Sequence, residues 1–217
     1  MTIDIILADD HKILRHGLKT ALDKEPDMSV VAEAEDGRAT LKLVRKHDPH
    51  VVLMDINMPD LNGIDATRQI VTEFPYVKVI GLSTHIHKRY VVGMLEAGAS
   101  GFLPKTCSFV ELKGAIKNVA DGKTYLSPDI AGLVIEKAFG PANDDAAGAL
   151  SELTSREREV LQLVAEGYTS REIAGKLFIS GKTVETHRRQ IMNKLKLHSI
   201  AELTKFAIRE GITDLET

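Results

Sequence analysis

The 217-residue sequence has no tryptophan and a single cysteine, Cys107. One cysteine excludes an internal disulfide and a cysteine-rich metal cluster, which fits a chain that works in the reducing cytoplasm. No apolar run approaches the about 20 residues of a membrane helix, so we expect no membrane span and no signal peptide. A strong excess of charge is also lacking. Lys and Arg total 28 against 31 Asp and Glu, and a net charge of −3 implies no acidic partner for the chain as a whole.

The basic residues are not spread evenly along the chain. Between residues 176 and 196 there are six bases and only one acid, Glu185. Such a cluster can match a phosphate backbone, although a solvated helix face can be just as charged. The six are Lys176, Lys182, Arg188, Arg189, Lys194 and Lys196.

A short apolar run, Val51–Met54, leads directly into Asp55 and is followed by Pro59 and Gly63. A continuous apolar run bounded by turn residues is typical of a strand buried on both faces of a parallel sheet. Asp55 would then lie at the carboxyl end of this strand, where open α/β sheets bind their ligands.

Strand and helix patterns alternate over residues 1–122, which we interpret as one domain. This alternation predicts a doubly wound, flavodoxin-like α/β fold with five parallel strands in the order 2-1-3-4-5. The predicted strands are Ile3–Ala8, Ser29–Ala34, Val51–Asp55, Val77–Leu82 and Ser100–Leu103. The predicted helices are His11–Asp23, Ala39–His47, Ile64–Phe74, Lys88–Ala97 and Phe109–Asp121.

Polar groups follow four of these strands: Asp9 and Asp10, then Asp55, Ser83 and Lys105. Each one alone could be a helix cap, a loop residue or a surface charge. Because the carboxyl ends of parallel strands share one edge of the sheet, we expect all five side chains to converge on one crevice.

Three carboxylates in one crevice repel each other unless a cation lies among them, and a small set of oxygen ligands suits Mg²⁺. Phosphoryl transfer depends mainly on positioning and charge neutralisation, which Mg²⁺ and the Lys105 ammonium would supply. The Ser83 hydroxyl could donate to a phosphoryl oxygen. We therefore interpret Asp55 as an acceptor of a phosphoryl group, whose added charge would act as a switch.

Residues 3–121 resemble a response-regulator receiver domain, through the acidic pair, Asp55 in Asp-x-x-Met-Pro-x-x-x-Gly, Ser83, and Lys105 in Leu-Pro-Lys-Thr. The resemblance implies that Asp55 takes its phosphoryl group from a sensor histidine kinase. It also implies that Mg²⁺ is held by Asp10, Asp55 and the backbone carbonyl of Asn57, with Asp9 helping through a water molecule.

The same resemblance implies that Ser83 and an aromatic residue on the fifth strand change position on phosphorylation. The matching aromatic is Phe102, where many relatives have tyrosine. Phenylalanine has no hydroxyl group, so any switch would depend on burial of its ring, and a purely structural role in the core is an equal alternative.

Residues 123–150 form the predicted linker. A short helix from Ser127-Pro128-Asp129 to Phe139 is followed by a segment of small and polar residues, 140–148, which we interpret as flexible.

Residues 151–217 are the predicted second domain, a small all-α bundle of four helices. Thr154 with Glu157, and Thr169 with Glu172, have the spacing of capping boxes that begin two helices. A tight turn then leads into a basic helix, an order typical of a helix-turn-helix, whose later helix enters the major groove of DNA. The third and fourth helices are predicted over Lys182–Leu195 and Ile200–Arg209, the fourth ending at Gly211.

The third helix has an apolar stripe of Val184, Ile191 and Leu195, with His187 beside it. Arg189 is a candidate reader of base edges, since arginine commonly binds guanine. Other residues are expected on the outside: Glu185, Thr186 and Met192, and the phosphate-contact candidates Lys182, Thr183, Arg188 and Lys194.

Residues 153–211 resemble the LuxR-type helix-turn-helix domain, through Leu-Thr-x-Arg-Glu-x-Glu-Val-Leu, Glu-Ile-Ala and Lys-Thr-Val-Glu-x-His. Combined with a receiver, this indicates the NarL/FixJ type of response regulator. The resemblance implies that Glu185, Thr186 and Arg189 read bases of an operator in double-stranded DNA, and that the fourth helix mediates dimerisation. RNA polymerase is a further expected partner, and no membrane is.

Two other functions are compatible with parts of this pattern. Phosphatases with an aspartate nucleophile carry a second aspartate two residues later, but here that residue is Asn57. A receiver-like module that acts without phosphorylation is the other alternative, and the intact acidic set argues against it. We therefore predict a phosphorylation-controlled transcription regulator rather than an enzyme.

Overall fold

The computed structural model describes residues 2–84, 87–139, 149–150 and 152–213. The chain divides into two compact units, Met1–Pro141 and Ala142–Thr217, and each is described here by itself. Among the described residues, no helix combines the length and the apolar character needed to span a lipid bilayer.

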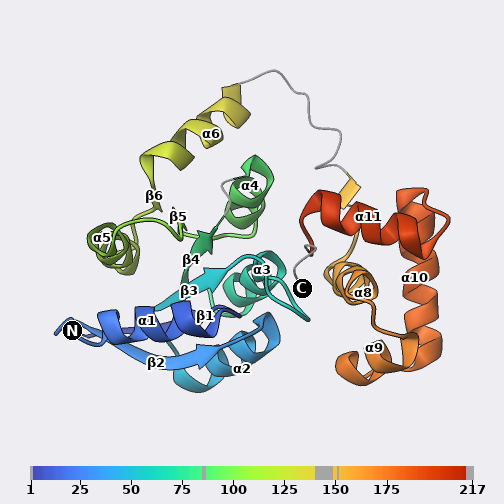
Figure 1. Cartoon of the computed structure of the whole chain (residues 1–217), viewed down its shortest axis with the longest axis horizontal. Coiled ribbons are helices and arrows are strands. Elements are labelled where there is room, and N and C mark those ends of the chain that lie inside the picture. Colours follow the sequence, from blue (N-terminus) through green and yellow to red (C-terminus); the bar gives the residue numbers. More distant parts are fainter. Residues whose placement is uncertain (1, 85–86, 140–148, 151, 214–217) are drawn as a thin grey trace. The chain divides into compact units, whose positions relative to one another are not determined.

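The first unit is built on a single parallel sheet (Figure 1). Its strand order is β2-β1-β3-β4-β5-β6, so the predicted order is confirmed and a sixth strand is added at one edge. The strands are β1 (Ile3–Ala8), β2 (Met28–Ala34), β3 (Val51–Asp55), β4 (Lys78–Ser83), β5 (Gly101–Pro104) and β6 (Tyr125–Leu126).

Helices follow each of the strands, as predicted. The first five begin and end within two residues of the predicted bounds, and the predicted helix up to Phe139 is also present. They are α1 (Lys12–Leu22), α2 (Gly37–His47), α3 (Gly63–Glu73), α4 (Lys88–Glu96), α5 (Phe109–Ala120) and α6 (Pro128–Phe139).

The sheet has a separate apolar core on each face, because successive side chains of a strand point to opposite sides. Ile6 and Ala8 of β1 belong to the core shared with α2, α3, α4 and α6. Ile5 and Leu7 belong to the core shared with α1 and α5. All five residues of β3 are buried, as expected for a central parallel strand.

The segment after α5 differs from the prediction of a linker. β6 pairs with β5, with Leu126 opposite Phe102, and α6 packs against α4. Ile130 of α6 is fully buried in the core that contains Tyr90 and Met94 of α4. Burial of this apolar face makes residues 125–139 part of the first compact unit, which therefore extends beyond the predicted receiver bounds of 1–122. The predicted flexible segment 140–148 lies outside the described residues.

The second unit consists of α8 (Ser155–Ala165), α9 (Ser170–Leu177), α10 (Gly181–Leu195) and α11 (Ile200–Glu210). Both capping boxes are confirmed: Thr154 N donates to Glu157 Oε2 at 2.7 Å, and Thr169 N donates to Glu172 Oε2 at 2.8 Å. Gly211 ends α11 with a positive φ of 72°, a conformation that glycine adopts readily.

Candidate functional site

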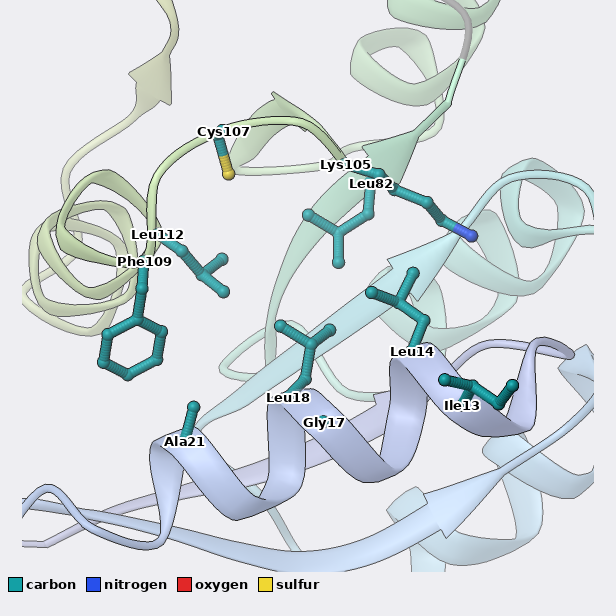
Figure 2. Close-up of a pocket in the computed structure, with 10 residues that line it drawn as sticks. All are labelled: Ile13, Leu14, Gly17, Leu18, Ala21, Leu82, Lys105, Cys107, Phe109 and Leu112. Atoms are coloured by element: carbon teal, nitrogen blue, oxygen red, sulfur yellow. The ribbon is translucent and has the colours of Figure 1, made fainter.

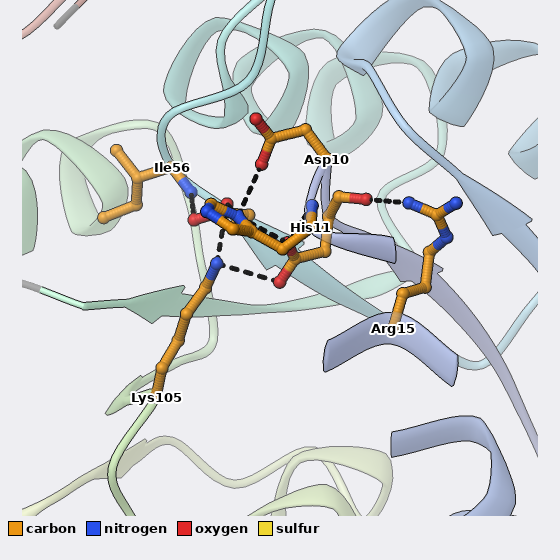
Figure 3. A network of polar contacts seen from close by, with 7 residues as sticks. Asp10, His11, Arg15, Ile56 and Lys105 are labelled. Atoms are coloured by element: carbon orange, nitrogen blue, oxygen red, sulfur yellow. Dashed lines mark hydrogen bonds and ion pairs between the residues drawn. The ribbon is translucent and has the colours of Figure 1, made fainter. Parts of the chain in front are cut away.

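The predicted acidic residues and Lys105 meet at the carboxyl ends of the strands (Figure 3). Asp9 and Asp10 directly follow β1, Asp55 is the last residue of β3, and Lys105 directly follows β5. The neighbouring positions of these three strands in the sheet bring the side chains together. The predicted convergence is thus confirmed for these four residues.

Asp55 is nearly fully buried and is held by two contacts. Its Oδ1 accepts a hydrogen bond from Ile56 N at 2.7 Å, and its Oδ2 accepts one from Lys105 Nζ at 2.7 Å. Burial raises the pKa of Asp55 to about 6. Attraction to Lys105 partly offsets this rise, whereas the nearby charges of Asp9 and Asp10 add to it. The carboxylate is therefore ionised at neutral pH and held in one orientation.

Lys105 bridges two carboxylates, since its Nζ lies 2.8 Å from Asp9 Oδ2 and 2.7 Å from Asp55 Oδ2. Burial lowers the pKa of this ammonium, but the contacts with Asp55 and Asp9 outweigh burial, so the net shift is upward. Lys105 therefore stays charged, and it neutralises part of the negative charge of the cluster.

Gly63 shapes the loop that follows Asp55. A Cβ atom placed on Gly63 would lie 1.9 Å from the backbone oxygen of Asp55, so no other residue fits without moving the backbone. Gly63 N also donates to Ile56 O at 2.8 Å, which closes the loop on itself. The loop between β3 and α3 is thus fixed against the strand end that carries the phosphoacceptor candidate.

His11 is a member of the cluster that the sequence interpretation missed. Its Nδ1 lies 2.8 Å from Asp10 Oδ1, 3.2 Å from Asp9 Oδ1 and 4.0 Å from Asp55 Oδ2. Its position directly after the acidic pair was the available signal. The apolar pattern of the sequence indicates only that His11 begins a helix.

Ser83 and Phe102 occupy the positions expected of them. Ser83 is buried at the end of β4, and its backbone oxygen accepts a hydrogen bond from Lys105 N at 2.8 Å. Phe102 is fully buried on β5, between Gly81 of β4 and Leu126 of β6 in the sheet. Its ring belongs to the core beneath α4, which fits the structural role. Its role as a switch stays a prediction.

An apolar pocket of about 400 Å³ lies between α1 and α5 (Figure 2). The aliphatic stem of Lys105 contributes to its wall, while the ammonium points towards the acidic cluster. Ile13, at the edge of this pocket, is 91% exposed. The pocket is also lined by Leu14, Gly17, Leu18, Ala21, Leu82, Cys107, Phe109 and Leu112.

In the second unit, the predicted inner and outer faces of α10 are largely confirmed. Val184 and Ile191 are fully buried, Leu195 is partly buried, and Arg189 is exposed. Met192 differs from the prediction, because it packs against the apolar core instead of facing outward. The exposed outer residues also include Lys182, Glu185 and Thr186.

Two basic residues of α10 are engaged within the unit. Lys194 Nζ lies 2.7 Å from the buried carboxylate of Glu157 and donates to Glu152 O at 3.1 Å. Arg188 donates to Ser170 Oγ at 3.1 Å and to Glu185 Oε1 at 3.0 Å. Lys194 therefore ties α10 to the start of α8, and its role as a phosphate contact stays a prediction.

The acidic cluster also fits a divalent cation. Asp9, Asp10, His11 and Asp55 each offer one ligand atom, and these atoms all lie within 4.8 Å of one another. Lys105 pairs with Asp9 and Asp55, and its single positive charge neutralises part of the negative charge of the carboxylates. Buried carboxylate oxygens with uncompensated charge are the ligands that Mg²⁺ prefers.

Comparison with known families assigns both units. Residues 5–117 match the family described as response regulator receiver domain, and residues 151–207 match the family described as bacterial regulatory proteins, luxR family. The first match covers every residue of the cluster in Figure 3, and the second covers α8 to α10 and most of α11.

Similar proteins align with this chain over nearly their whole length. The chain is 39% identical to the transcriptional regulatory protein DegU of Brevibacillus brevis, over 96% of this chain and 94% of that protein. It is 36% identical to the oxygen regulatory protein NreC of Staphylococcus carnosus (strain TM300), over 97% of this chain and 99% of that protein.

Solved structures are similar as well. The response regulator ChrA of a heme-sensing two-component system is 32% identical, with a TM-score of 0.54, over 97% of this chain and 98% of that one. RcsB of Salmonella enterica serovar Typhimurium, bound to the promoter rprA with the phosphomimetic BeF₃⁻, is 27% identical, with a TM-score of 0.60, over 95% and 98%. The chain thus belongs to the two-component response regulators of the NarL/FixJ type, transcription regulators that join a receiver domain to a LuxR-type DNA-binding domain.

Proposed function

We propose that Asp55 accepts a phosphoryl group from the phosphohistidine of a sensor kinase, and that this modification controls dimerisation and binding to operator DNA. The observation that carries the proposal is the buried Asp55 carboxylate at the end of β3, in contact with Lys105 and next to the acidic pair Asp9 and Asp10. A carboxylate in this setting has little use in the core of a domain, because its burial is unfavourable.

The chemistry requires few groups from the protein. An oxygen of Asp55 would attack the phosphorus as the phosphorus–nitrogen bond of phosphohistidine breaks, and the kinase histidine would leave as imidazole. As negative charge builds up on the oxygens of the transferred group, the Lys105 ammonium can move its contact from the Asp55 carboxylate to one of these oxygens. The Ser83 hydroxyl can donate a hydrogen bond to another. Bound Mg²⁺ would neutralise charge during this transfer.

Four residues are proposed to hold the ion. They comprise the carboxylates of Asp10 and Asp55, the backbone carbonyl of Asn57, and Asp9 through a water molecule. Asp9 and Asp55 each have an oxygen bound to Lys105, so the lysine orients both carboxylates as it pairs with them.

The experiment for the first part is phosphorylation of the full chain by acetyl phosphate with Mg²⁺, followed by intact mass. We expect one added phosphoryl group in the native protein and in the control Asp121→Asn, an exposed carboxylate at the end of α5. Asp55→Ala should stay unmodified. Equal labelling of Asp55→Ala and the native protein would refute Asp55 as the acceptor.

In the second domain we propose that α10 reads DNA. Arg189 is the main candidate for base contact because it is exposed on the outer face of this helix, and Glu185 and Thr186 stand beside it. Thr183 and Arg188 are candidate phosphate contacts, as is Lys182, which is exposed in the first turn of the helix. Bound to an operator in the cytoplasm, a dimer would influence transcription through RNA polymerase.

Selection of operators from a random DNA pool tests this assignment. Arg189→Ala should relax the preference at one position of each half-site, because a bidentate contact to a base is worth about 1–3 kcal/mol. Lys182→Ala should weaken binding to all sequences alike. The matched control is Lys46→Ala, an exposed lysine in the last turn of α2 in the first unit. An unchanged selected sequence with Arg189→Ala would remove this residue as the reader.

A further inference from the structure

The helices α9 and α10 pack against each other (Figure 1), and a ring of three hydrogen bonds joins their side chains. Ser170, the first residue of α9, donates from its hydroxyl to Glu185 Oε1. Arg188 Nη1 donates to both partners, to Ser170 Oγ at 3.1 Å and to Glu185 Oε1 at 3.0 Å. The carboxylate of Glu185 is therefore held by side chains from two helices.

The chemistry of the three groups gives the ring one direction. An ionised carboxylate only accepts and a guanidinium only donates, so the Ser170 hydroxyl accepts from Arg188 and donates to Glu185. The hydrogen bond from Ser170, together with the charges of Arg188 and Arg189, outweighs burial and lowers the pKa of Glu185. At neutral pH Glu185 is therefore ionised, and it can accept hydrogen bonds but not donate them.

The second oxygen of Glu185 is available to a ligand. Both bonds of the ring use Oε1, and in the part of the chain that the structure describes Oε2 has no hydrogen-bonding partner. The side chain is 52% exposed. Glu185 lies about one helical turn before the exposed Arg189, so the two residues share a face of α10. A fixed acceptor is thus presented beside the proposed reader of bases.

Arg188 is placed differently from an arginine that meets a phosphate group. Its side chain is only 22% exposed, and its guanidinium is already engaged by Ser170 and Glu185. The pair of Glu185 and Arg188 has no net charge, so the repulsion between this carboxylate and the phosphates of DNA is reduced. The position of Arg188 therefore suits the support of Glu185 better than a contact with the DNA backbone.

We propose that Ser170 and Arg188 are positioning residues that hold Glu185 as the acceptor for the amino group of a cytosine in each half-site of the operator. The inference rests on the proposed function in one respect, namely that α10 enters the major groove. There, cytosine presents an amino donor, guanine presents only acceptors, and adenine has an acceptor beside its amino group. A carboxylate that is fixed and cannot donate is matched best by cytosine.

The first test measures binding of the full chain, treated with acetyl phosphate and Mg²⁺, to the selected operator with each base in turn at every position. Glu185→Ala should lower the preference for cytosine at one position by about fivefold or more, as for the loss of a specific base contact. Ser170→Ala and Arg188→Ala should lower it at the same position by about twofold or more, because an orienting hydrogen bond is lost. An unchanged preference in both of these variants would overturn the proposal.

Controls separate this effect from damage to the fold. Ser170→Thr keeps the hydroxyl and should keep the preference for cytosine, and so should Lys46→Ala, an exposed lysine of the first unit. Thermal unfolding checks that every variant folds. If the loss of Arg188 unfolds the domain, the comparison of Ser170→Ala with Ser170→Thr decides the question by itself.

The second test asks whether Arg188 acts through Glu185. When Glu185→Ala is already present, Arg188→Ala should cause no further loss of preference, because no carboxylate remains to be positioned. Arg188→Ala alone should also leave the slope of log affinity against log salt concentration unchanged, since no phosphate contact is lost. Additive losses of preference would make Arg188 an independent contact. Equal weakening for all four bases, with a slope reduced by about one, would make it a phosphate contact. Either result overturns the inference.

Failure of the proposed function would look different. If the native protein selected no common sequence from the random pool, α10 would not read DNA, and the inference would fall with it. If Arg189→Ala relaxed the preference while Glu185→Ala and Arg188→Ala left the selected sequence unchanged, the proposed function would stand and only the inference would be overturned.

Discussion

When no cation is bound, the ionised and buried carboxylate of Asp55 lowers the stability of the receiver. Its pKa in the folded protein is about 6, above the value of about 4 in an unfolded chain, because burial disfavours its charge. The folded protein therefore binds the proton more tightly, and the contribution of Asp55 to stability is lost as the pH rises from about 4 through 6. At neutral pH the carboxylate destabilises the metal-free receiver.

Asp55→Asn should therefore stabilise the metal-free receiver at pH 7.5, by up to about 3 kcal/mol for a shift of about two pKa units. The gain should shrink at pH 5, where the native carboxyl is mostly protonated. Thermal unfolding at both pH values measures the difference. A variant that is less stable than the native protein at pH 7.5, or a gain that is larger at pH 5, would contradict this explanation.

Glu157 shows the opposite situation: its carboxylate is buried, but the contact with Lys194 compensates its charge. Burial alone would raise the pKa of Glu157, but hydrogen bonds from Lys194 and Thr154 outweigh it and lower the pKa. Lys194→Ala should destabilise the second unit by about 1–2 kcal/mol, less than the loss of a fully buried pair would cost, because Lys194 is itself 35% exposed. Chemical unfolding measures the loss, and Lys205→Ala, with the same loss of charge at an exposed site, should have little effect.

At the scale of elements, the packing of α6 differs most from what the sequence predicts. The helix itself was predicted, but its docking onto α4 was not, because a short amphipathic helix beside a polar segment looks the same whether it packs or not. Ile130→Ala should destabilise the receiver by about 2–4 kcal/mol, since a fully buried isoleucine leaves a cavity. Ile135→Ala, on the same helix but 59% exposed, is the control. Similar small losses for both variants in chemical unfolding would show that α6 is not held in the core.

The sequence was most informative where a local pattern determines the structure. The apolar run into Asp55 and the two capping boxes predicted their elements to within one or two residues. It was least informative where a side chain could serve two purposes. Lys194 looked like a phosphate contact because its charge is visible in the sequence, whereas its partner Glu157 lies 37 residues away. His11 was overlooked for the same reason, since the direction of its ring depends on the folded cluster.

At the scale of the whole molecule, the two units have separate apolar cores. The two cores of the receiver and the core of the DNA-binding domain share no described residue. We therefore expect calorimetry of the full chain to resolve two unfolding transitions. Asp55→Asn and added Mg²⁺ should shift only the transition of the receiver, and Lys194→Ala only the other. A single transition, shifted by all of these changes, would mean that the units unfold together.

The pairing of β6 with β5 affects where the receiver can be separated from the rest of the chain. A chain cut at residue 122 would leave the whole of β5 as an unprotected edge and would expose the apolar surface that Ile130 covers. An open edge beside exposed apolar side chains favours strand pairing between molecules and aggregation. An isolated receiver that ends after α6, at residue 139 or later, should stay monodisperse where the shorter one precipitates.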